Sequence, residues 1–227
     1  MCGRYTLRTQ LNQVLQQFAA ESSSATWEPR YNIAPTQHAP VVLIEEERRV
    51  LQTMRWGLIP SWAKEASLGA KMINARGETV AEKPAFRAAF KRRRCLIPAD
   101  GYYEWRRSGA KKQPYYFHQP DDQPFAMAGL WEEWTGEIKG ETHPWRSFTI
   151  ITTESNDQTG KIHDRMPAIL TEEDWDLWLD PEFADKPRLQ KMLHPLADEE
   201  YFEIDQVSTR VNSPKNDSAE CVQVEEG

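Results

Sequence analysis

The spacing of hydrophobic residues predicts a few short helices. In the segment 7–18, apolar residues recur every three or four positions, at Leu11, Val14, Leu15 and Phe18. This spacing places their side chains on one side of an α-helix, so the pattern predicts a helix there. Shorter helices are predicted over 172–179 and 187–193, where apolar residues punctuate strongly charged segments.

Runs of β-branched and aromatic residues predict more strands than helices. Segments 41–44 and 50–54 flank a charged turn and are typical of a hairpin. Segments 115–117 and 125–130 are predicted to pair around a turn at 119–123. Further strands are predicted at 95–97, 147–153 and 201–207. Segment 135–142 is predicted to be a flexible loop, and 224–227 a frayed end.

The order of these elements indicates the fold class. Strands outnumber helices, and the two do not alternate along the chain, which favours an α+β fold with a curved, mostly antiparallel sheet. The chain shows no internal repeat, low-complexity segment or long linker. We therefore expect a single domain over residues 1–227 with a few flanking helices.

Composition narrows the class of protein. Hydrophobic residues make up 39% of the 227 positions and nine residues are Trp, enough for a largely aromatic core. No run approaches the roughly 20 apolar residues of a membrane helix, and the N-terminus lacks a secretory pattern. Three widely spaced cysteines exclude a disulfide framework and offer no paired zinc ligands. We expect a soluble, intracellular protein with no metal and no cofactor.

The charge distribution leaves nucleic acid open as a partner. The net charge of -7 argues mildly against it, because phosphate binding usually requires a basic surface. However, acidic residues are concentrated at 172–176 and 180–205, and basic residues at 91–94 and 106–112. This separation permits a local basic face on an acidic molecule.

Cys2 is notable for its position. Removal of Met1 would leave an α-amine with a pKa near ~7.7–8 beside a thiol with a pKa near ~8.5. Such an aminothiol can act as an N-terminal nucleophile, or it can condense with an aldehyde to a five-membered thiazolidine. Position alone favours an incidental small residue. The following Gly3 and Arg4 shift that balance, because they allow close backbone approach and a phosphate or carboxylate clamp.

Two further residues are candidates for proton transfer. His163 is flanked by Asp164 and Arg165, and histidine is the natural acid or base near neutral pH, although a histidine is more often structural. Glu104 lies among aromatic residues in ADGYYEW, where partial desolvation raises a carboxyl pKa and suits a proton donor. The alternative for Glu104 is a half-exposed strand residue paired with Arg106 or Arg107.

Other polar and aromatic residues suit contact with a nucleic acid. Alternation places Asn74 and Arg76 on one side of an extended segment, where they can bind sugar or phosphate oxygens. The alternative for Arg76 is a salt bridge to Glu78 or Asp164. Three tryptophans beside Gly, Pro or charged residues are candidates for base stacking, with core packing the stronger interpretation for each: Trp56, Trp62 and Trp105.

Together these motifs resemble the SRAP (SOS response-associated peptidase) family, also described as abasic-site processing proteins. The resemblance rests on segments that follow one another along almost the entire chain. They are CGRY from Cys2, YNIAPTQ from Tyr31, WGLIPSWAK from Trp56, INARGET from Ile73, RCLIPADGYYEW from Arg94, TIITTESN from Thr149, IHDRMPAIL from Ile162 and VSTRVNSPKND from Val207. The resemblance implies a barrel-like sheet.

The resemblance also implies roles for single residues. Cys2 would form the thiazolidine link to a ring-opened deoxyribose, and Asn74 would position the abasic sugar. Glu104 would donate a proton during ring opening, and His163 would transfer protons in Schiff-base formation and in reversal of the link. The residues expected to hold the DNA strand are Arg4, Trp62, Arg76, Trp105 and Thr152.

We therefore expect an enzyme that crosslinks itself to abasic sites in single-stranded DNA, with family-implied removal of Met1, lyase activity and a place in the SOS response. It would act as a monomer, without a membrane, beside the replication machinery, in the cytoplasm at the nucleoid or in a eukaryotic nucleus. The alternatives are an N-terminal-nucleophile peptidase acting on peptides, and a non-enzymatic module that only binds single-stranded DNA.

Overall fold

A closed five-stranded barrel forms the body of the molecule. The computed structural model describes residues 2–22, 27–108, 111–197 and 201–225. The barrel runs through β5 (Arg48–Trp56), β4 (His38–Glu45), β7 (Arg94–Ala99), β10 (Phe125–Ile138) and β11 (Glu141–Glu154). Parallel pairing of β11 with β5 closes it, and the other neighbouring pairs are antiparallel.

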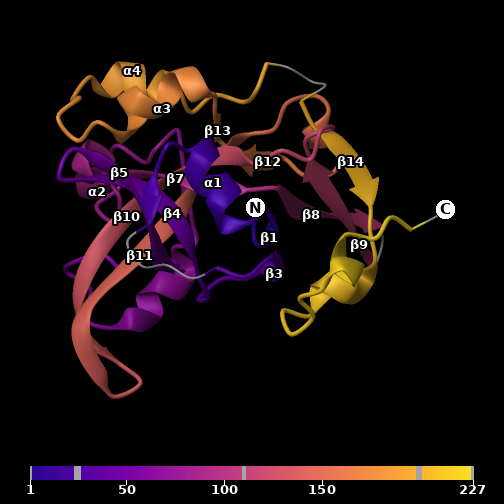
Figure 1. Ribbon diagram of the computed structural model, residues 1–227, viewed down its shortest axis with the longest axis horizontal. Helices are drawn as coiled ribbons and strands as arrows, with labels where there is room; N and C mark the ends of the chain where they lie inside the picture. The colour runs from indigo at the N-terminus through magenta and orange to yellow at the C-terminus, as the bar shows by residue number, and fades with distance from the viewer. Residues whose placement is uncertain (1, 23–26, 109–110, 198–200, 226–227) are drawn as a thin grey trace.

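Short strands extend the barrel, and a second sheet stands beside it. The barrel is joined by β2 (Glu21–Ser22), β6 (Asn74–Arg76), β12 (Arg165–Pro167) and β13 (Ile169–Leu170). The second sheet has the order β14 (Glu203–Gln206), β9 (Lys111–His118), β8 (Gly101–Ser108), β1 (Tyr5–Leu7) and β3 (Arg30–Ile33). Figure 1 shows this sheet at the right of the barrel.

The helices are short and lie outside the sheets. They are α1 (Leu11–Gln17), α2 (Arg87–Arg92), α3 (Glu172–Leu179) and α4 (Lys186–Lys191). Single 3-10 turns are η1 (Ala66–Lys71), η2 (Thr159–Lys161), η3 (Thr209–Asn212) and η4 (Ala219–Val222). The predicted α+β class, with a curved, barrel-like and mostly antiparallel sheet, is confirmed.

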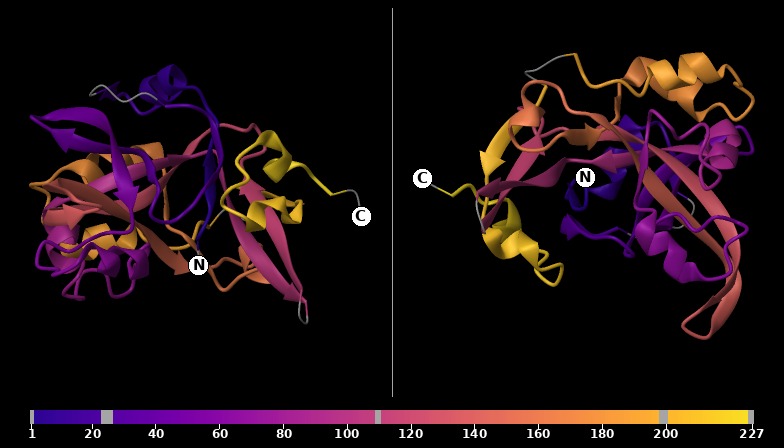
Figure 2. Two further views of the ribbon diagram at one scale, coloured as in Figure 1. Left: turned by 90° about the horizontal axis from the view of Figure 1, so that it is seen from below. Right: turned by 180° about the vertical axis from the view of Figure 1, so that it is seen from behind.

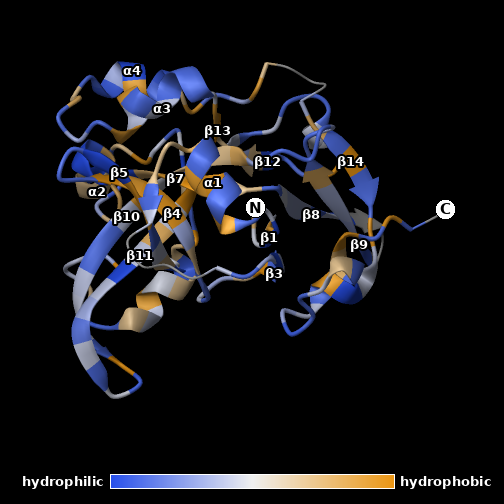
Figure 3. Ribbon diagram, in the orientation of Figure 1, coloured by the Kyte–Doolittle hydropathy of each residue, from blue (hydrophilic) through white to orange (hydrophobic). Residues whose placement is uncertain are grey.

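The barrel holds together because alternate strand residues fill its interior. Hydrophobic positions gather around β4 and β7 at the centre of the molecule (Figure 3). Trp56 is fully buried; its ring is stacked with Phe148, with centroids 6.3 Å apart, and meets the edge of Tyr5 at 5.2 Å. Trp56 is therefore a core residue, which confirms core packing, the stronger of its two interpretations, and excludes it from base stacking.

Several local predictions hold and others fail. The hairpin over 41–44 and 50–54 is confirmed as β4 and β5, and the predicted helix at 172–179 is confirmed as α3. The pairing predicted between 115–117 and 125–130 is wrong, since β9 pairs with β8 and β14 whereas β10 belongs to the barrel. Apolar character alone does not select a strand's partner, and the connection at 119–124 crosses between sheets.

Two predicted boundaries also change. The segment 7–18 is helical only from Leu11, because Leu7 belongs to β1, where it pairs with Arg30. The loop predicted at 135–142 is the end of a regular hairpin, in which Ile138 pairs with Glu141. Its turn residues Lys139 and Gly140 have φ of 53° and 86°. Positive φ at both turn positions matches the twist of paired strands.

The C-terminal end is paired rather than frayed where it is described. Val224 forms an isolated antiparallel bridge with Val207, and the Glu225 N–H donates to the Gln206 carbonyl at 2.9 Å. Residues 226–227 of the predicted frayed end lie outside the described residues.

The two basic clusters predicted from the sequence do not share a face. Figures 1 and 2 place α2, which carries Lys91 and Arg92, at the opposite end of the molecule from the β8–β9 hairpin. Arg94 is only 2% exposed, and burial lowers its pKa to about 10. Its guanidinium donates to the carbonyls of Phe90, Lys91, Trp178, Asp180 and Phe183. Arg94 therefore fastens α2 and α3 to the barrel.

Arg94→Met is expected to lower the free energy of unfolding by about 3–5 kcal/mol, because it leaves several buried carbonyls without a donor. Urea denaturation followed by tryptophan fluorescence measures the change. The control Lys91→Met removes an exposed charge from the same helix and should change stability by less than about 0.5 kcal/mol. Equal, small losses in both variants would contradict the anchoring role.

Candidate active site

The segment that contains Cys2 lies between the barrel and the second sheet (Figure 1). Strand pairing fixes this position: Tyr5 pairs with Tyr102 of β8, and the Tyr103 N–H donates to the Arg4 carbonyl at 3.0 Å. Cys2 is fully buried, with its Sγ 3.9 Å from the Arg4 carbonyl oxygen. The interpretation of Cys2 as an incidental residue at a loose chain end therefore does not fit the structure.

Asn74 holds the backbone of Cys2 from the barrel side. It lies on β6, which runs parallel to β11 with Ile150 beside Asn74. The Asn74 side-chain Nδ2 donates to the Cys2 carbonyl at 2.9 Å. The predicted extended segment is confirmed, with Ala75 buried between the partly buried Asn74 and the exposed Arg76.

Glu104 approaches the same place from β8 of the second sheet. It is 3% exposed, and burial, with a smaller contribution from the charge of Asp164, raises its pKa to about 7. The alternative pairing with Arg106 is not seen, because that guanidinium lies over the Tyr115 ring, 4.9 Å from its centroid. The side chain of Arg107 lies outside the described part of the structure. Near neutral pH, Glu104 can therefore either donate or accept a proton.

His163 completes the cluster from the connection between η2 and β12. Its Nε2 lies 3.9 Å from Glu104 Oε2. Its Nδ1 lies 3.0 Å from both the Arg165 backbone nitrogen and Asp164 Oδ1. Since the Arg165 N–H donates to Nδ1, the neutral ring carries its proton on Nε2, directed at Glu104.

The cysteine thiol at this site is protonated at rest. Burial, followed by the charge of Glu104, raises the pKa of the Cys2 thiol far above its ordinary value. Burial also raises the pKa of Cys95, a residue of barrel strand β7. Cys2 differs because a carboxyl group, an imidazole and an amide converge on its segment. No group of His, Cys, Asp or Glu in the described ranges is arranged to hold a metal ion.

The residues expected to hold DNA are in different environments. Trp62, in the connection after β5, is 59% exposed, and Arg76 is also exposed. Trp105 packs on the face of β8 opposite Glu104 and donates from Nε1 to Asn212 at 2.7 Å. Thr152 is only 1% exposed, with its hydroxyl 3.5 Å from the Ala75 carbonyl. Trp62 and Arg76 are thus accessible, whereas Trp105 and Thr152 are engaged in the scaffold.

Arg4 is partly buried, and is therefore intermediate between the accessible residues and those engaged in the scaffold. Its Nη1 donates to the Gly3 carbonyl at 2.8 Å, which folds the side chain back over the N-terminal segment. Burial lowers the pKa of the guanidinium, although arginine remains charged at neutral pH. Arg4 therefore brings a positive charge to the N-terminal segment, at the Gly3 carbonyl.

Sequence reasoning assigned no role to Arg165, which supports the His163 loop. Its guanidinium binds both carboxylate oxygens of Glu78, at 2.6 and 3.0 Å, and donates to the Thr152 carbonyl at 2.7 Å. Glu78 therefore pairs with Arg165, while Arg76, for which a salt bridge to Glu78 was the alternative interpretation, contributes less to lowering the pKa of Glu78. The adjacency of Arg165 to His163 was the only signal in the sequence.

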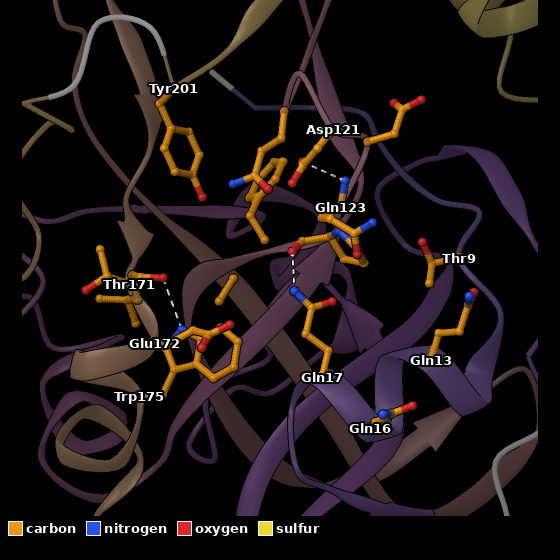
Figure 4. Close-up of a pocket in the computed structure, with 16 residues that line it drawn as sticks. Thr9, Gln13, Gln16, Gln17, Asp121, Gln123, Thr171, Glu172, Trp175 and Tyr201 are labelled. Carbon is orange, nitrogen blue, oxygen red and sulfur yellow. Dashed lines mark hydrogen bonds between the residues drawn. The ribbon is translucent and has the colours of Figure 1, made fainter.

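A separate cleft of about 820 Å³ lies away from this cluster. Figure 4 shows it between α1, the β9–β10 connection and the start of α3, with Gln13, Gln17, Asp121 and Trp175 on its walls. None of Cys2, Asn74, Glu104 or His163 lines it. The candidate catalytic residues therefore lie outside this cleft.

Comparison with known proteins identifies the relatives of this chain. The family model described as "SOS response associated peptidase (SRAP)" matches residues 1–214. The chain is 43% identical to abasic site processing protein YoqW of Bacillus subtilis, over 98% of this chain and 99% of that protein. It is 36% identical to abasic site processing protein HMCES of Xenopus tropicalis, over 89% of this chain and 68% of that protein.

Solved structures extend the similarity to the fold. A crystal structure of a protein from Bacteroides thetaiotaomicron matches with a TM-score of 0.86 and 30% identity, covering 99% of this chain and 100% of that one. Among the described residues, no helix is long and apolar enough to cross a membrane. By sequence and by fold, the chain belongs to the SOS response associated peptidase (SRAP) family.

Proposed function

We propose that this protein processes abasic sites in single-stranded DNA by forming a thiazolidine between Cys2 and the opened sugar, after removal of Met1. One observation carries the proposal: Cys2, held through its carbonyl by Asn74, is close enough to Glu104 for the charge of that carboxyl to act on its thiol, and Glu104 in turn faces His163. The names of relatives such as YoqW and HMCES, which describe abasic-site processing, support the choice of substrate.

The first chemical requirement is an aldehyde. An abasic sugar is mainly a closed hemiacetal, which must open before an amine can attack it. With a pKa of about 7, Glu104 is protonated in a large fraction of molecules near neutral pH. It is positioned to give that proton to the ring oxygen, and the carboxylate that results accepts the proton of the hydroxyl group on the same carbon.

The next steps join the sugar to Cys2. The free amine of Cys2 adds to the aldehyde carbon, and loss of one water gives a Schiff base. The Cys2 sulfur then attacks the same carbon, its proton passes to the nitrogen through His163 or Glu104, and the thiazolidine ring closes. Protonation of the thiazolidine nitrogen or sulfur reverses these reaction steps. Formation and reversal of the link therefore both use Glu104 and His163.

Contacts with the strand surround this chemistry. We assign Arg4 and Arg76 to the phosphates and Trp62 to a base, because a charged or exposed aromatic side chain suits these roles. Trp105 and Thr152 would act by holding the neighbouring strands and loops in place, since both are engaged in the scaffold.

The burial of Cys2 disfavours the alternative of a peptidase that acts on free peptides. A nucleophilic cysteine usually needs a lowered pKa, and the pKa of Cys2 is raised. Condensation with an aldehyde begins at the amine and does not need a thiolate. The peptidase activity in the family description fits best with removal of Met1 from the chain's own N-terminus.

Cys2→Ala should abolish the crosslink to an abasic oligonucleotide that survives denaturation, while affinity for intact single-stranded DNA stays nearly unchanged. Cys2→Ser is the sharper variant: like Cys2→Ala it keeps the amine, but it also keeps a polar group of similar size in place of the thiol. It should form a Schiff base that borohydride traps on a denaturing gel, but little crosslink without borohydride. Cys221→Ala is the control and should crosslink normally. A full crosslink in Cys2→Ala would contradict the proposal.

Glu104→Gln should slow crosslink formation near pH 7 by about 10²–10⁴-fold, because the amide keeps the shape but cannot give up a proton in this way. In the unmodified protein the protonated fraction of Glu104 falls as pH rises through about 7, so its rate should decline there. Time courses across this range should show the decline in the unmodified protein and not in the variant. An equal decline in both would assign it to another group.

A further inference from the structure

Asp164 makes a contact that the reaction as described leaves unused. It follows His163 directly, and its Oδ1 lies 3.0 Å from the imidazole Nδ1. The same nitrogen lies 3.0 Å from the backbone N–H of Arg165. One partner of Nδ1 is therefore a donor and the other an acceptor.

These two partners suit different protonation states of His163. A neutral imidazole accepts the Arg165 N–H at Nδ1, and its own proton sits on Nε2, which lies 3.9 Å from Glu104 Oε2. When the ring takes a second proton, Nδ1–H becomes a donor, and the Asp164 carboxylate is already within hydrogen-bonding distance. When His163 takes up a proton, Nδ1 therefore loses the Arg165 N–H as its partner and gains the Asp164 carboxylate.

We propose that Asp164 is a positioning residue that stabilises the imidazolium form of His163 and so sets the pH range in which His163 and Glu104 exchange protons. This inference rests on the proposed function, since it concerns the same proton-transfer pair. It assigns to Asp164 no contact with the sugar or the DNA.

Of the charged groups described around His163 and Glu104, Asp164 is the one placed to stabilise the imidazolium. From β8, Glu104 faces the ring, and the charge of Glu104 in turn acts on the Cys2 thiol of the N-terminal segment. The neighbouring Arg165 guanidinium is directed at Glu78 and the Thr152 carbonyl. Asp164 therefore supplies the negative charge that contacts Nδ1, on the side of the ring away from Glu104.

Asp164 acts on both members of the pair in the same direction. Its charge favours a proton on His163 through the contact at Nδ1, and it adds to the burial that raises the pKa of Glu104. Its side chain is 88% exposed, so water screens both effects. An exposed charge pair of this kind corresponds to about half a pH unit in a titration midpoint.

The test is the pH profile of crosslink formation, and of exchange onto competitor DNA, from about pH 5.5 to about pH 8.5. Asp164→Asn keeps the side-chain shape and removes the charge. The rising part of the profile, set by His163, and the falling part, set by Glu104, should both move to lower pH by about half a unit. Each of the two residues loses its proton more easily when the negative charge of Asp164 is absent. Asp164→Glu should restore the profile. Asp157→Asn removes an exposed charge from the turn before η2 and should leave the profile in place.

A lower rate with an unmoved profile in Asp164→Asn would overturn the inference, and so would an equal shift in Asp157→Asn. A second readout does not need DNA. An NMR titration of the His163 ring, assigned with His163→Gln, should show a lower midpoint in Asp164→Asn. Failure of the unmodified protein to crosslink would reject the proposed function, whereas normal crosslinking with an unshifted midpoint would reject only the role of Asp164.

Discussion

The hydrogen bond from Asn74 to the Cys2 carbonyl is the constraint on which the site depends. The barrel presents Asn74 through β6, whereas the second sheet carries the N-terminal segment through the pairing of β1 with β8. A side-chain amide bonded to a backbone carbonyl at 2.9 Å therefore joins the two sheets at the residue proposed to react. Strand pairing fixes the segment from Arg4 onward, and this hydrogen bond fixes the backbone of Cys2 itself.

Burial at this junction determines the protonation states of Cys2 and Glu104. The same desolvation that keeps the Cys2 thiol protonated brings the pKa of Glu104 to about 7. A protonated carboxyl and a neutral thiol are poorly suited to catalysis by a thiolate. They suit the addition of an amine to an aldehyde, because that reaction needs a proton donor for the oxygen that leaves as water. The Arg165–Glu78 pair stabilises the loop that carries His163, so the acid–base partner comes from a fixed position.

The sequence predicted the fold class because strand runs and turn signals are local. The β4–β5 hairpin and α3 followed from spacing alone. Pairing of β9 with β8 and β14 did not, because it depends on contacts between distant segments that carry equally apolar residues. The end of the β10–β11 hairpin looked like a loop because its polar residues face solvent, although the strand ladder continues to the turn.

The candidate residues were predictable to a similar degree. Cys2, Asn74, Glu104 and His163 were singled out from the sequence, and the structure brings them together at one junction. The burial of Trp56 agrees with core packing, the stronger interpretation from the sequence, whereas the contact of Asp164 with the imidazole could not be predicted because it depends on how the complete fold orients the ring.

The central claim is that the Cys2 amine and thiol together capture the abasic sugar, and mass spectrometry of the nuclease-trimmed crosslink tests it most directly. The account predicts a protein that lacks Met1 and carries the opened sugar minus one water, with the modification on the Cys2 peptide and no free thiol at Cys2. A crosslinked protein that retains Met1, or a sugar attached to a lysine, would contradict it.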